Sequence, residues 1–301
     1  MKGFLQEYGI IMVVVAVVLG MLAFGKTGYA KSIQDAILGS ADHIVETGEN
    51  IVPKPKRQSS MLINGQAFTK TIPETAKSVV FCDEKAPDGV ITTDLTAKQD
   101  NDVVGWLDGT TWKVSTQDDS KKVMFNTDSS SMFINHNNIT SVRFDNIDTS
   151  NVENMKDMFT CTFVTSLDLS SFDTSKVTTM EEMFSYCSRL TSLNLSSFDT
   201  SNVENMRNMF IECTGLTSLD LSSFDISNVK STSGMFYNCF GLTSLDLSSF
   251  DTSNVKNIWT GTFNMFYGCR KLTNVFCRTQ EDLDYLSKVY ADSVSSNAQF
   301  V

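Results

Sequence analysis

A unit of 26 residues repeats through the C-terminal half of this 301-residue chain, and it restricts the possible folds more than any other feature. The strings that begin at Leu190, Leu216 and Leu242 are nearly identical over twelve residues. A phenylalanine column follows the same period: Phe172, Phe198, Phe224 and Phe250. A period of this length is typical of proteins in which one small supersecondary unit stacks on the next.

Each repeat combines two apolar patterns. Leu219 and Leu221 alternate with polar residues, which predicts a strand with one buried face. A second set recurs at helical spacing: Val203, Met206, Met209 and Phe210. The Ser-x-x-Glu strings at residues 150–153 and 201–204 have the form of a capping box, so we predict a short helix or helical turn after each strand. Stacked copies would pair their strands in a parallel sheet, about 4.8 Å apart.

The full unit reads Leu-Thr-Ser-Leu-Asp-Leu-Ser-Ser-Phe-Asp-Thr-Ser-Asn-Val, followed by Met-Phe-x-x-Cys. It closely resembles the BspA-like leucine-rich-repeat surface proteins of bacteria, over roughly Ser130 to Arg278. The resemblance implies a secreted or surface-bound protein, and several members of that family are adhesins. The predicted fold class is an α/β repeat solenoid (leucine-rich repeat) with a β-rich N-terminal cap and a long N-terminal membrane helix.

The N-terminal segment predicts membrane insertion. Residues from Tyr8 to Gly25 carry no charge over 18 positions, which is just enough for a helix to cross a bilayer. Retention as an anchor is the favoured interpretation, and a signal peptide cleaved after Ala30 is an alternative. The pair Glu7-Tyr8 before this run also weakly resembles Flp-type pilins, although Lys2 stands where their cleavage site has glycine.

The predicted organisation has six parts. They are a transmembrane anchor (1–25), an amphipathic helical stalk (26–51), a linker (52–60), a β-rich cap (61–129), the repeats (130–278) and a C-terminal cap (279–301). In the β-rich cap, Val103 to Val114 predicts a hairpin that turns at Asp108-Gly109. Residues 281–291 predict a closing helix. The predicted location is the cell surface, with the anchor in the cytoplasmic membrane and the repeats outside.

Five of the seven cysteines recur at one position of the repeat: Cys161, Cys187, Cys213, Cys239 and Cys269. His136 takes this position in an earlier, degenerate copy. Neighbouring cysteines would lie about 5 Å apart, within reach of a disulfide, but free cysteine is also among the most buried residue types. We predict that they form a buried, reduced core ladder with the phenylalanine column, and one or more disulfides are the alternative.

An aspartate column accompanies the repeats: Asp148, Asp173, Asp199, Asp225 and Asp251. Hydrogen bonds to the backbone of the following turn would explain it, and a calcium ladder is the alternative. No cofactor or metal is predicted. With only two histidines, and no pairing of a nucleophile with a base, the sequence does not predict an enzyme.

The outward positions of the strands form a lattice of small polar groups, which either binds a partner or is simply solvated. An insertion in the last repeat adds aromatic residues. The candidate partner-binding residues are Asp168, Asn194, Asp220, Asp246, Trp259, Phe263, Tyr267 and Phe276. A net charge of −11 argues against nucleic acid as a partner.

The predicted function is therefore cell-surface binding or adhesion, in which the repeats are presented to an extracellular protein or glycan ligand. The alternative is a pilin-like structural subunit that self-assembles through its N-terminal helix in the membrane and displays the repeats.

Overall fold

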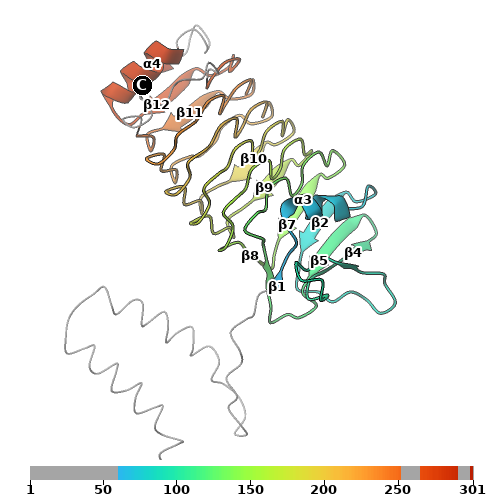
Figure 1. Ribbon diagram of the computed structural model, residues 1–301. Helices are drawn as coiled ribbons and strands as arrows, with labels where there is room; N and C mark the ends of the chain where they lie inside the picture. Colours follow the sequence, from blue (N-terminus) through green and yellow to red (C-terminus); the bar gives the residue numbers. More distant parts are fainter. Residues whose placement is uncertain (1–59, 252–264, 291–298, 301) are drawn as a thin grey trace, which may run out of the picture. The chain divides into compact units, whose positions relative to one another are not determined.

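A computed structural model describes residues 60–251, 265–290 and 299–300 (Figure 1). Its strands are short: β1 Ser60–Met61, β2 Ser78–Phe81, β3 Thr93–Asp94, β4 Val104–Asp108, β5 Thr111–Ser115, β6 Val123–Met124, β7 Ser141–Phe144, β8 Ile147–Asp148, β9 Ser166–Asp168, β10 Ser192–Asn194, β11 Ser244–Leu247, β12 Asn274–Cys277 and β13 Gln299–Phe300. Helical segments in these ranges are α3 Gly65–Phe68, the 3-10 turn η1 Thr69–Thr71, and α4 Gln280–Tyr290.

A five-stranded sheet of order β3-β4-β5-β2-β7 precedes the regular repeats. Strands β4 and β5 pair antiparallel, which confirms the predicted hairpin. Asp108 pairs with Thr111, so the two-residue turn consists of Gly109 and Thr110, one residue later than the predicted Asp108-Gly109, and Gly109 has a φ of 60°. Glycine adopts such a left-handed conformation without steric cost. Strand β2 then pairs in parallel with both β5 and β7, so the hairpin lies at the outer side of the first repeat strands.

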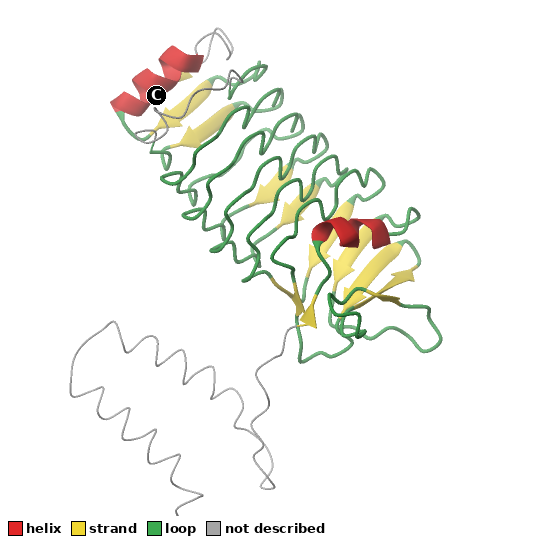
Figure 2. Cartoon of the chain, viewed as in Figure 1, coloured by secondary structure: helices red, strands yellow, loops and turns green. Residues whose placement is uncertain are grey.

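Beyond β7 the repeats lie side by side, and each residue pairs with its counterpart one period away. Ser192 pairs with Ser166 in the parallel pair β9–β10. Strands β11 and β12 pair in the same way across the longer, 30-residue copy, with Leu245 beside Val275. Inward side chains of all the repeats and of the first sheet join one continuous hydrophobic core, from Leu62 to Leu286. Figure 2 shows that short strands (yellow) alternate in the repeats with long stretches of turn and loop (green).

The predicted fold class is wrong for the described residues, because the repeats contain no helices there. The Met-Phe segments form what we call the turn ladder: residues 154–161 and their equivalents 179–186, 205–212 and 231–238. Asp157 and Cys161 have φ of 57°, and Glu182 and Tyr186 have similar values, which an α-helix does not allow. The described chain is thus a set of small sheets of short strands joined by turns, not an α/β solenoid.

Backbone hydrogen bonds in the turn ladder connect neighbouring repeats and also close single turns within a repeat, such as that from the N–H of Thr160 to the carbonyl of Asp157 at 3.1 Å. The N–H groups of Met155, Asp157, Phe159 and Cys161 donate to carbonyls of residues 179, 181, 183 and 185 in the next repeat, over 2.8–3.1 Å. The predicted capping box is wrong for the same reason. The N–H of Glu204, which would bind a capping side chain in a helix, donates to the carbonyl of Thr178 in the preceding repeat at 2.8 Å.

At the C-terminal end, β12 continues the repeat sheet and β13 pairs with it in parallel. Helix α4 follows β12 in the chain and corresponds to the predicted closing helix. Thr279 precedes it, and its hydroxyl oxygen accepts a hydrogen bond from the N–H of Asp282 at 3.1 Å. The hydroxyl of Thr279 in turn donates to the carboxylate of Asp282, which orients this capping side chain. Leu286 of α4 is buried in the core.

The predicted membrane anchor and stalk lie outside the described residues, and so does the predicted linker except for its last residue, Ser60. Within the ranges that the structure describes, no helix is both long and apolar enough to span a bilayer. The predictions of a transmembrane helix, a signal anchor and a location in the cytoplasmic membrane are therefore corrected: the described structure contains no element that supports them.

Candidate partner-binding surfaces

The outward face of the repeat strands carries Asp168, Asn194, Asp220 and Asp246, all exposed. Each side-chain oxygen accepts a hydrogen bond from the N–H of the serine two residues later, at 2.9–3.1 Å. Asn194 also donates to Asp168 across the β9–β10 pair at 3.2 Å. We call these four residues the polar column. Their side chains are oriented by their own turns, so the column is a preformed surface.

Two of these carboxyls are held in the charged form. Hydrogen bonds from the side chain and backbone of Ser170 lower the pKa of Asp168, and those from Ser222 lower the pKa of Asp220. Hydrogen bonds to a carboxylate favour its charged form. Asp168 and Asp220 therefore stay anionic below neutral pH.

Phe276 extends the same face beside the polar column. It pairs with Asp246 across strands β11 and β12, and 42% of its surface is exposed. Arg143 stands at the other end of the face on β7, where it forms an ion pair with Asp145 of the following turn. The strand face thus carries a line of polar groups with an aromatic side chain at its C-terminal end.

The remaining predicted binding residues do not gather on this face. Trp259 and Phe263 lie outside the described residues. Tyr267 is half exposed, but it lies beside the turn ladder, where its ring stacks on that of Tyr237 with centroids 5.0 Å apart. Its neighbour Phe266 is fully buried in the core. The structure therefore separates Tyr267 from Phe276.

The aspartates of the second column cap turns. Asp148, Asp173, Asp199 and Asp225 accept hydrogen bonds from the N–H of the serine two residues later, at 2.8–3.0 Å. Asp251 pairs with Arg278 at 2.9 Å. The contacts of the first four aspartates are the turn hydrogen bonds that the sequence predicted, and the turn after Asp251 lies outside the described residues. In the described ranges, no three His, Cys, Asp or Glu side chains lie together as a metal site would require.

Cys187, Cys213, Cys239 and Cys269 are completely buried, and all seven cysteines are free thiols. Each of the four donates from Sγ to a phenylalanine carbonyl of the preceding repeat, at 3.0–3.1 Å. Burial raises their pKa, to about 11 for Cys187 and about 12 for Cys269. These thiols are neutral hydrogen-bond donors at neutral pH, so they are poor nucleophiles and poor metal ligands.

Cys161 does not belong to this column, which corrects the predicted core ladder. Thr162 occupies the column position, and its Oγ1 lies 3.4 Å from Sγ of Cys187. Cys161 takes the preceding, left-handed position, equivalent to that of Tyr186, and is only half-buried. The repeat here is one residue shorter. Because the missing residue follows Thr162, the spacing of 26 between Cys161 and Cys187 is misleading.

The phenylalanine column lies in the core, since Phe172, Phe198, Phe224 and Phe250 are each 2% exposed. A second column of phenylalanines stacks more regularly, although the sequence predicted these residues only as part of a helix. Its members are Phe133, Phe159, Phe184, Phe210, Phe236 and Phe266. Neighbouring rings are nearly parallel, with centroids 5.2–5.8 Å apart. The Met-Phe pair that recurs in each repeat is the sequence feature that could have predicted this second column.

A family model described as "Mycoplasma protein of unknown function, DUF285" matches residues 110–192, 127–245 and 193–280. Together the matches extend from the β4–β5 turn to the start of α4, which is more than half of the chain. The chain belongs to this family. No curated protein and no solved structure matches it. Because the DUF285 family has no known function, the resemblances to BspA-like proteins and Flp-type pilins stay predictions.

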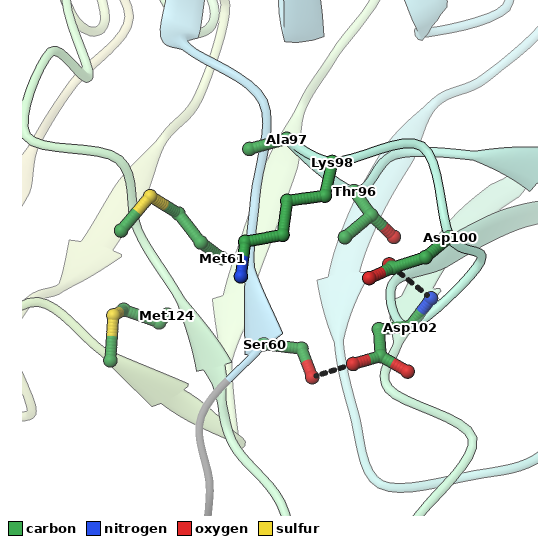
Figure 3. Close-up of a pocket in the computed structure, with 8 residues that line it drawn as sticks. All are labelled: Ser60, Met61, Thr96, Ala97, Lys98, Asp100, Asp102 and Met124. Atoms are coloured by element: carbon green, nitrogen blue, oxygen red, sulfur yellow. Dashed lines mark hydrogen bonds between the residues drawn. The ribbon is translucent and has the colours of Figure 1, made fainter.

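One pocket of this DUF285 protein was not predicted from the sequence (Figure 3). It has a volume of about 270 Å³ and lies where β1 meets the loop before β4. Its lining is Ser60, Met61, Thr96, Ala97, Lys98, Asp100, Asp102 and Met124. The hydroxyl of Ser60 donates to Asp102 at 3.1 Å, and the N–H of Asp102 donates to Asp100 at 3.3 Å. Both carboxylates therefore help to shape the loop.

His136 occupies the position equivalent to the cysteine column, as predicted. Its Nε2 lies 3.0 Å from both Oγ1 and the carbonyl oxygen of Thr69. Burial lowers its pKa, so the ring is neutral at neutral pH. In this DUF285 protein, His136 thus attaches the segment after α3 to the first repeat. The second histidine, His43, lies outside the described residues.

Proposed function

We propose that this protein is a non-enzymatic binding protein that presents the strand face of its repeats to a protein or glycan partner. The observation that carries the proposal is the polar column, in which four equivalent exposed side chains are each fixed by a hydrogen bond to their own turn. Groups that are already ordered lose little conformational entropy when a partner binds them.

Two further features favour binding over catalysis. The thiols of the cysteine column are buried and neutral, and the imidazole of His136 is bonded to Thr69, so none of them is available as a nucleophile or base. Exposed Phe276 beside Asp246 adds an aromatic anchor to an otherwise polar face. Aromatic side chains commonly supply most of the affinity at such surfaces.

The test is to screen the full chain against arrayed glycans and a panel of purified extracellular proteins, and then to repeat each positive with variants. Asp220→Lys/Asp246→Lys reverses the charge of the polar column, and Phe276→Ser removes the anchor. The control, Asp88→Lys/Asp119→Lys, makes the same change of charge in exposed loops outside the repeats. We expect the first two variants to lose binding and the control to keep it. Equal binding by all three would refute a role for this face.

A further inference from the structure

A second surface lies at the corner of each repeat, where the turn ladder ends and the chain turns back toward the next strand. It collects most of the exposed aromatic side chains in the described repeats. Tyr186, Phe240 and Tyr267 are 50%, 37% and 52% exposed. With Phe163 and two arginines they form what we call the Arg–aromatic edge: Phe163, Tyr186, Arg189, Phe240, Tyr267 and Arg270.

Each arginine of the edge lies over an aromatic ring of the preceding repeat. The guanidinium carbon of Arg189 is 4.3 Å from the centroid of Phe163, and that of Arg270 is 5.7 Å from the centroid of Phe240. The ring attracts the cation and limits its orientations. The N–H groups at the rim of each guanidinium stay available, and they match the two oxygens of a carboxylate.

The edge also carries positive charge without an ion-pair partner. In the described repeats Lys156 and Lys230 pair with Glu181 and Glu204. Within the described residues neither Arg189 nor Arg270 has an ion-pair partner, and both are exposed. On a chain of net charge −11, the two arginines are therefore available to an anionic group. Charge complementarity therefore favours an anionic partner.

The form of the edge favours a peptide over a sugar chain. Arg189 and Arg270 cover the faces of Phe163 and Phe240, so a pyranose ring cannot stack on the covered faces. The two arginines are three repeats apart, about 14 Å at a strand spacing of about 4.8 Å. In an extended peptide, carboxylates four residues apart lie about 13 Å from each other.

We propose that the Arg–aromatic edge binds an extended acidic segment of a partner protein, with carboxylates at Arg189 and Arg270 and apolar contacts at Tyr186 and Tyr267. This inference rests on the proposed binding function and names the chemistry of one partner. Tyrosine suits the second role because it offers a large contact area with few rotatable bonds.

The experiment measures binding of a fluorescein-labelled ten-residue peptide of alternating Glu and Ser to the full chain by fluorescence anisotropy. The Gln/Ser peptide of the same length tests the need for charge, and polygalacturonate tests an acidic glycan. Arg189→Gln/Arg270→Gln removes both edge cations. The matched control is Lys176→Gln/Arg207→Gln, which removes two other exposed cations of the repeats.

We expect the edge variant to bind the Glu/Ser peptide about tenfold more weakly than the unmodified chain, and the control to stay within about twofold. The proposal is overturned if the unmodified chain does not bind this peptide, if both variants weaken equally, or if polygalacturonate binds more tightly than the peptide. Ligands from the screen that still need Asp246 and Phe276 would in that case leave the proposed function standing. If the unmodified chain binds neither the acidic peptide nor any ligand of the screen, both proposals are wrong.

Discussion

At the scale of single residues, burial of the cysteine column makes stability depend on alkaline pH. The Cys187 thiol has a pKa of 9.0 when unfolded and about 11 in the fold. Above pH 9 the unfolded chain releases this proton while the folded chain keeps it, so the free energy of unfolding decreases as pH rises from 9 to about 11.

The measurement is urea denaturation at several pH values for the unmodified chain and for Cys187→Ala. Alanine leaves a cavity, so the variant is less stable throughout. It cannot titrate at this position, however, and we expect its stability to fall less steeply above pH 9. Parallel curves would show that the thiol of Cys187 does not carry this pH dependence.

Tyr186 combines backbone strain with exposure. Its φ is 58°, a conformation that bulky residues adopt at a cost of roughly 1–2 kcal/mol. Equivalent positions two repeats away on either side carry Asn135 and Asn238, and asparagine tolerates this conformation better. We expect Tyr186→Asn to raise the free energy of unfolding by about 1 kcal/mol and to weaken binding of the acidic peptide.

Thermal and chemical denaturation of Tyr186→Asn measure the first effect, and anisotropy measures the second. Ser188→Asn, two residues later and without positive φ, is the control for the introduction of asparagine. A destabilised Tyr186→Asn protein would mean that contacts of the tyrosine ring outweigh the backbone strain.

The same left-handed position explains which residues of the candidate site could not be assigned from the sequence. Cys161 and Cys187 are 26 residues apart, so they appear equivalent, yet Thr162 is the true counterpart of Cys187. The apolar pattern shows that one residue is missing, because Val164 follows Phe159 by five positions and Leu190 follows Phe184 by six, but it does not show whether the gap precedes or follows Cys161. The place of the gap becomes visible only from backbone conformation, here the positive φ shared by Cys161 and Tyr186.

At the scale of elements, the turn ladder shows why apolar spacing predicted a helix. Met206, Met209 and Phe210 face the core at intervals of three and one, as a helix would arrange them. Two successive turns with a left-handed residue place the same side chains inward. What decides between them is the partner of N–H groups such as those of Met206 and Phe210, which would be local in a helix and lies in the next repeat here. A single repeat cannot reveal that partner.

A threonine column also joins neighbouring repeats. Oγ1 of Thr174 donates to the carbonyl of Asp199 at 2.8 Å and accepts from its N–H at 2.9 Å. Thr149 and Thr200 make the same two bonds with the next repeats. All three threonines are buried. One hydroxyl thus bonds both backbone groups of a residue in the next repeat.

We expect Thr174→Val to lower the free energy of unfolding by about 1–2 kcal/mol, because valine keeps the volume but leaves the partly buried N–H and carbonyl of Asp199 without these two hydrogen bonds. Urea denaturation measures the change. Thr217→Val, at an exposed position of the following repeat, is the control and should change stability little. Similar losses for both variants would contradict this role of the threonine column.

At the scale of the whole molecule, the sequence period predicts neighbours better than it predicts element types. Ser192 beside Ser166 and Leu193 beside Leu167 follow directly from the spacing of 26. The Arg–aromatic edge could not be found in this way. It depends on Arg189 meeting Phe163 and Arg270 meeting Phe240, at positions where the repeats differ from their consensus. Such departures look like noise until the repeats are placed side by side.

The period also makes a prediction about the described unit as a whole. Deletion of residues 198–223 removes one full period and joins Ser197 to Phe224, so every inward column stays in phase. We expect this variant to fold and to give a circular dichroism spectrum of the same shape as that of the unmodified chain. Deletion of residues 198–210 is the control: it removes half a period, places polar residues in the core columns, and should abolish cooperative unfolding.

The same deletion tests the spacing argument at the edge, because it leaves Tyr186, Arg189, Phe240, Tyr267 and Arg270 in place. The two arginines would then be two repeats apart, about 10 Å instead of about 14 Å. In an extended peptide, a separation of about 10 Å corresponds to three residues instead of four. We therefore compare two peptides whose two glutamates lie three or four residues apart. The unmodified chain should bind the four-residue spacing more tightly, and the deletion variant should bind the three-residue spacing more tightly. An unchanged order would mean that the arginines attract acidic peptides without reading the distance between their charges.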